Sequence, residues 1–70
     1  MIREGTAVKW KWGQGWGNGS VLEIHREKVE REIKGTVVTR QGTKSNPAYL
    51  IEQSDGDLVL KLGAELERDD

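Results

Sequence analysis

The segment that most constrains the fold runs from Pro47 to Leu62, PAYLIEQSDGDLVLKL. Two runs rich in branched and aromatic side chains flank Asp55-Gly56, and neither run has an internal proline. Asp-Gly is a favoured pair for a two-residue type I′ turn, because both central residues of that turn need positive φ. The segment therefore predicts a β-hairpin, and with it a small all-β protein.

The predicted turn also sets the register of this hairpin, because it pairs Gln53 with Leu58 and Ile51 with Leu60. In that register one face carries Tyr49, Ile51, Leu58, Leu60 and Leu62. The opposite face carries Leu50, Glu52, Val59 and Lys61. Turn type and face pattern thus agree with each other.

The N-terminal part predicts two strands joined by a glycine-rich loop. Residues 6–12 alternate, with Val8, Trp10 and Trp12 on one face, which is typical of a half-buried strand. Residues 13–19 contain four glycines, which favour a structural hairpin loop over regular structure. They do not match a phosphate-binding motif, because the spacing is wrong and a strand, not a helix, follows at residues 20–25.

Residues 26–34 leave two alternatives open. As a helix they would form charge pairs four residues apart, but Val29 and Ile33 alone make a poor buried stripe. As a strand they would turn at Lys34-Gly35 into residues 36–40, a run of high β-propensity. We favour the hairpin.

These elements predict one SH3-like barrel of five to six short antiparallel strands with a C-terminal helical turn. The chain has 70 residues, too few for two large packed sheets, and closure of a barrel removes exposed edges. We expect the barrel to span residues 5–66, the helical turn to begin at Gly63, and residues 1–4 and 67–70 to be flexible termini.

The whole pattern resembles a known family. The stretch Val8-x-Trp10-Lys11-Trp12-Gly13 and the blocks at residues 47–52 and 59–62 are similar to the Tudor-like domain named after hypervirulence-associated proteins. That domain occurs in small stand-alone bacterial proteins and in some fungal ones. The resemblance covers about residues 5–66 and implies an SH3/Tudor-type barrel. It implies no catalytic residues.

The amino-acid composition reduces the range of functions to be expected. Eleven Lys and Arg against twelve Asp and Glu give a formal charge of −1, whereas a dedicated nucleic-acid binder usually has a basic excess. His25 is the only histidine and cysteine is absent, so no conventional zinc site or nucleophile set is expected. We therefore expect no enzyme and no cofactor. With no long apolar run and no signal-peptide pattern, we expect a cytoplasmic protein and no membrane partner.

The aromatic residues are the best candidates for binding. In Tudor-type barrels, aromatic rings around the mouth can hold a methylated lysine or arginine through cation–π attraction. Trp12, Trp16 and Tyr49 would form such a cage if the first loop folds over the last hairpin. The competing interpretation makes Trp10 and Trp12 core residues, since a small domain without Phe needs their buried area.

A second functional hypothesis is weak binding of nucleic acid. Exposed aromatic rings could stack on single-stranded bases while Lys9, Lys11, Arg40 and Lys44 meet phosphates. We favour a non-catalytic module that recognises a protein or peptide partner through the aromatic barrel mouth. We expect it to be a monomer or a weak homodimer.

Overall fold

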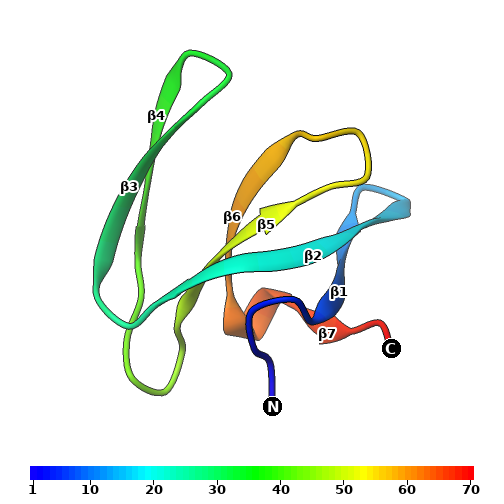
Figure 1. Ribbon diagram of the computed structural model, residues 1–70, viewed down its shortest axis with the longest axis horizontal. Coiled ribbons are helices and arrows are strands. Elements are labelled where there is room, and N and C mark those ends of the chain that lie inside the picture. Colours follow the sequence, from blue (N-terminus) through cyan, green and yellow to red (C-terminus); the bar gives the residue numbers. More distant parts are fainter.

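Antiparallel β-strands make up nearly all of the regular structure in the computed structural model, which describes residues 1–70 (Figure 1). In chain order the elements are β1 (Ala7–Trp12), β2 (Gly15–His25), β3 (Lys28–Ile33), β4 (Thr36–Gln41), β5 (Ala48–Glu52), β6 (Leu58–Leu62), the 3₁₀ turn η1 (Gly63–Glu65) and β7 (Glu67–Arg68). The expected small all-β fold with a C-terminal helical turn is confirmed. No helix has the length and apolar character needed to cross a membrane.

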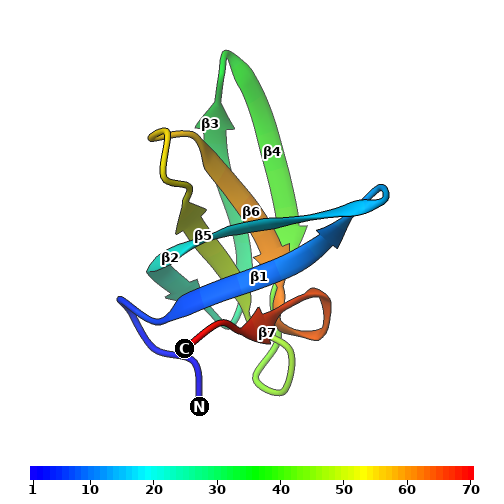
Figure 2. The same cartoon turned by 90° about the vertical axis from the view of Figure 1, so that its right-hand side faces the viewer.

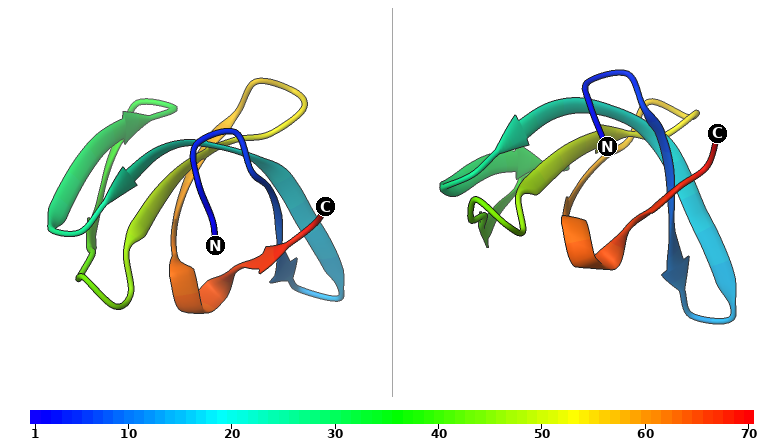
Figure 3. Two further views of the ribbon diagram at one scale, coloured as in Figure 1. Left: turned by 60° about the horizontal axis from the view of Figure 1, so that its bottom comes forward. Right: turned by 90° about the horizontal axis from the view of Figure 1, so that it is seen from below.

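The strands form a five-stranded sheet of order β6-β5-β2-β1-β7 and a separate two-stranded hairpin, β3-β4. β2 pairs with β1 through its first half and with β5 through its second half. A register shift between Val21 and Glu23 marks a bulge, and bulges increase the bend of a strand. The sheet therefore curves into the barrel-like shape seen in Figures 2 and 3.

The β3–β4 hairpin packs beside β6, away from the tip of the β1–β2 hairpin (Figure 1). Its turn residues, Lys34 and Gly35, both have positive φ, 51° and 77°, as a type I′ turn requires. The favoured strand interpretation of this region is confirmed, and the helical alternative is wrong.

The core consists of two clusters on opposite faces of the main sheet. One contains Val8, Trp10, Val21, Tyr49 and Ile51. The other lies under the β3–β4 hairpin and contains Val29, Ala48, Leu50 and Leu60. β5 supplies both clusters with alternate side chains, which explains why Ala48 to Ile51 are all apolar and all buried.

The last hairpin differs from the sequence expectation by one residue in register. The structure pairs Ile51 with Val59 and Leu50 with Leu60. The reason is a three-residue loop: the N–H of Gly56 donates to the carbonyl of Gln53 (2.9 Å), and the N–H of Gln53 donates to the carbonyl of Asp57 (2.8 Å). Only Gly56 in this turn has positive φ, at 90°.

This slip exchanges the faces of β6 relative to the expectation. Val59 and Lys61 lie on the face of Tyr49 and Ile51, while Leu58, Leu60 and Leu62 lie against the β3–β4 hairpin. The expected single apolar face is therefore wrong. Both faces of the hairpin are largely apolar because both are covered.

The glycine-rich segment is a strand rather than a loop. A tight turn at Gly13-Gln14 brings Gly15 opposite Trp12, and β2 continues from there. The strand needs glycine because other groups lie against its backbone. A Cβ at Gly17 would lie 2.5 Å from Cε2 of Trp10, and one at Gly19 would overlap the carbonyl oxygen of Glu52.

The C-terminal residues also differ from the expectation of a frayed tail. Glu67 and Arg68 pair with Lys9 and Val8 on the outer edge of β1. The N–H of Asp69 continues this pairing by donating to the carbonyl of Ala7 at 2.9 Å.

Candidate functional site

The β1–β2 hairpin places the three tryptophans in three different environments. Trp10 is 3% exposed, Trp16 50% and Trp12 71%. Trp10 and Trp12 share one face of β1 as expected, and they lie opposite Gly17 and Gly15. Trp16 lies opposite Lys11, so its side chain belongs to the other face of the hairpin.

On the concave side of the sheet, Trp12 borders a groove of about 440 Å³. Trp10 and Val59 supply its apolar surface, and Gln53 and Lys61 supply its polar groups. Gly17 allows the Trp10 ring to lie directly on the β2 backbone, so the ring forms the floor of the groove. We call this hollow the Trp12 groove. Trp16 also borders it, although its ring contacts the lysines of the outer face.

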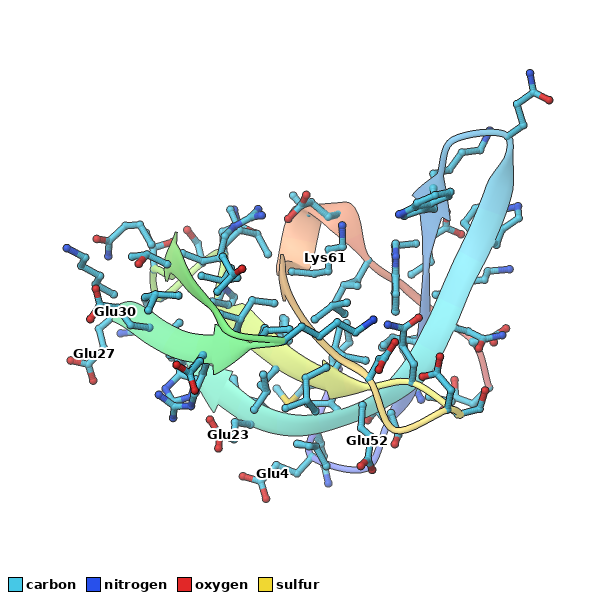
Figure 4. The ribbon with its side chains drawn as sticks, turned by 90° about the horizontal axis from the view of Figure 1, so that it is seen from above. Glu4, Glu23, Glu27, Glu30, Glu52 and Lys61 are labelled. Carbon is cyan, nitrogen blue, oxygen red and sulfur yellow. The ribbon has the colours of Figure 1, made fainter.

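The Trp12 groove contains one cation and no carboxylate. The Nζ atom of Lys61 lies 5.9 Å from the centroid of the Trp10 ring, within the range of a cation–π contact. Lys61 makes no ion pair, and Figure 4 shows it on the opposite side of the sheet from Glu4, Glu23 and Glu52. The groove therefore carries a single positive charge that no carboxylate neutralises.

On the outer face, Trp16 lies between two lysines of β1. The Nζ atoms of Lys9 and Lys11 are 5.0 and 5.8 Å from the centroid of its ring. Neither lysine makes an ion pair. We call this set of three residues the Lys-Trp-Lys face.

The structure does not bring the expected aromatic cage together. Tyr49 is 7% exposed and packs in the core with Val8 and Ile51. Trp12 and Trp16 lie on opposite faces of their hairpin. Trp12 and Trp16 both border the Trp12 groove, but Tyr49 does not join them, because its side chain packs in the core.

The four basic residues expected to contact phosphates do not form one patch in the structure. Lys9 and Lys11 share the outer face of β1. Arg40 is held in an ion pair with Glu65, and Lys44 lies on the exposed loop after β4. Lys61 was missed as a site residue; the correct pairing of Lys61 with Tyr49 would have placed it beside the aromatic residues.

A separate charged cluster joins β2 to the β3–β4 hairpin. Oε1 of Glu23 accepts hydrogen bonds from Nε2 of His25 and from Arg31, both at 2.7 Å. The hydrogen bond from His25, followed by the bond and charge of Arg31, lowers the pKa of the Glu23 carboxyl from its usual value, while burial opposes this shift. This cluster links the two sheets.

Nothing in the structure forms a metal centre, since no three His, Cys, Asp or Glu side chains lie close enough to share an ion. No buried side-chain polar atom lacks a hydrogen-bond partner. The exposed aromatic and basic groups of the β1–β2 hairpin are therefore the principal candidates for binding.

Comparison with known proteins identifies a family through one match. No curated protein and no solved structure matches the chain. The family model described as "Hypervirulence associated proteins TUDOR domain" matches residues 5–66, which is nearly the whole chain. The protein therefore belongs to the family of hypervirulence-associated proteins with a TUDOR domain.

Proposed function

We propose that this domain binds a protein or peptide partner in the Trp12 groove. The observation that carries the proposal is Trp12, 71% exposed beside a groove whose floor is the buried Trp10 ring. Tryptophan is enriched among the residues that dominate binding energy at protein interfaces. Tudor-like domains are generally non-catalytic binding modules, which agrees with a role in recognition.

The charge of the groove indicates the chemistry of the partner. Lys61 already occupies the cation position over Trp10, so a methylated lysine would meet a like charge there. A segment that combines an apolar side chain with a carboxylate fits better, because the apolar group can pack on Trp12 while the carboxylate pairs with Lys61. The groove thus favours an acidic, partly apolar peptide.

The test is a selection of random peptides displayed on phage against the folded domain, followed by calorimetry of the selected sequences. We expect selected peptides to carry Asp or Glu near an aromatic or branched residue. Trp12→Ala should weaken their binding by about 30-fold or more, the loss of a typical hot spot. Val37→Ala is the matched control, because Val37 is 64% exposed but lies on the β3–β4 hairpin.

The charge reversal Lys61→Glu gives a second readout. It should abolish binding of the acidic peptides and shift the selection toward basic ones. Peptides that bind Trp12→Ala as tightly as the wild type would show that the groove is not the binding site.

A further inference from the structure

The outer face of the β1–β2 hairpin has a chemistry of its own. It presents a half-exposed indole ring flanked by two ammonium groups, all from adjacent antiparallel strands. Residues 5–22 contain Lys9 and Lys11 but no Asp or Glu, so this hairpin is positive although the whole chain carries −1. None of the charge on the two lysines is neutralised by an ion pair.

We propose that the Lys-Trp-Lys face binds single-stranded nucleic acid. A base would stack on the Trp16 ring, and Lys9 and Lys11 would contact the phosphates on its two sides. Stacking platforms combined with cations that follow the backbone are how proteins bind single strands without sequence preference. Lysine has a flexible four-carbon stem, so an ammonium over the ring can move to a phosphate and leave the ring to a base.

The same residues argue against a duplex as the ligand. Bases in a duplex are already stacked on one another, so a single half-exposed ring gains little from them. Duplex binding also depends on neutralising many phosphates, and this face offers two lysines. Arg40, which is paired with Glu65, and the remote Lys44 do not extend it.

Acidic residues limit the site to the tip of the hairpin. β7 places Glu67 opposite Lys9, and β5 places Glu52 opposite Ser20 of β2. The favourable region therefore covers only a few nucleotides, and binding should be weak. Removing one of these charges with Glu67→Gln should tighten it.

The proposal differs from that for the Trp12 groove, because it rests on the outer face, where the Trp16 ring meets Lys9 and Lys11, although Trp16 also borders the groove. The test is fluorescence anisotropy of a labelled thymidine oligonucleotide of about ten nucleotides, roughly one single-strand site. If both lysines contact phosphates, log K should fall with log salt at a slope of about −1.4, or roughly 25-fold between about 20 and 200 mM salt.

Single substitutions separate the contribution of base stacking from that of the phosphate contacts. Trp16→Ala should weaken binding by roughly 5- to 150-fold at constant slope, because it removes one base stack. Lys11→Ala should reduce the slope to about −0.7. Lys28→Ala, an exposed lysine on β3, is the matched control and should leave both quantities unchanged. Two-dimensional amide NMR spectra establish that each variant is folded.

The indole signals of the folded wild-type protein complete the test. Addition of the oligonucleotide should shift the Trp16 indole signal and leave that of the buried Trp10 in place. Absence of binding at low salt would overturn the proposal. So would binding that survives Trp16→Ala, or equal affinity for the corresponding duplex.

Discussion

Replacing Gly17 with alanine probes how the floor of the Trp12 groove is built. The new Cβ would lie 2.5 Å from Cε2 and 2.6 Å from Nε1 of Trp10, against 3.4–4 Å for ordinary contact. The ring would therefore have to retreat by about 1 Å, the difference between these distances. It has little room, because it is 3% exposed and packs against Val8 and Tyr49.

Overpacking of this kind typically costs about 1–3 kcal/mol. For a domain of this size, about 2 kcal/mol lowers Tm by roughly 8–16 °C. Differential scanning calorimetry measures this loss. Gly15→Ala is the control: it lies on the same face of β2, has no positive φ, and its Cβ would come no closer than 3.8 Å to the Trp12 carbonyl. Equal Tm values for the two variants would refute the packing role assigned to Gly17.

Three further predictions concern other elements. Gly56→Ala should lower the free energy of unfolding by about 1 kcal/mol in urea titrations, because φ at Gly56 is +90° although its surroundings are open. Trp10→Ala should cost about 3–5 kcal/mol and abolish the thermal transition, whereas Trp12→Ala should change stability by less than about 0.5 kcal/mol. The pKa of Glu23 is lower in the folded protein than in the unfolded chain, where it is about 4.3. The ionised carboxylate therefore stabilises the fold above the unfolded pKa, and this stabilisation is lost as the pH falls through the folded-state pKa. Urea titrations should therefore show that Glu23→Gln reduces stability at neutral pH and not at pH values below that range; an equal reduction at both would contradict the assigned role.

Local sequence signals were sufficient for most of the strands and for one turn. The Lys34-Gly35 turn has the geometry that its residues favour, and the alternation of residues 6–12 places Trp10 and Trp12 on one face as observed. The errors arose where tertiary packing decides. Glycine propensity alone argues against a strand at residues 15–19, but the Trp10 ring and the β5 backbone require glycine at Gly17 and Gly19.

The register error had a similar origin. Asp55-Gly56 fits a two-residue loop by composition, yet the observed loop includes Ser54 and shifts every pair by one. The pattern of apolar residues could not distinguish the two registers, because β5 and β6 carry apolar residues on both faces. The separation of Trp12 from Trp16, by contrast, follows from placing a two-residue turn at Gly13-Gln14, a signal that the sequence contains.

The most direct test of the central claim is an NMR titration of a selected acidic peptide into the folded domain, following the tryptophan indole signals. If the peptide binds in the groove, the Trp12 indole signal should shift together with the backbone amide signals of Gln53 and Lys61. The backbone amide signal of Lys9, whose side chain lies on the outer face, should not shift. Shifts confined to the β3–β4 hairpin, with the Trp12 signal unmoved, would contradict recognition through the groove.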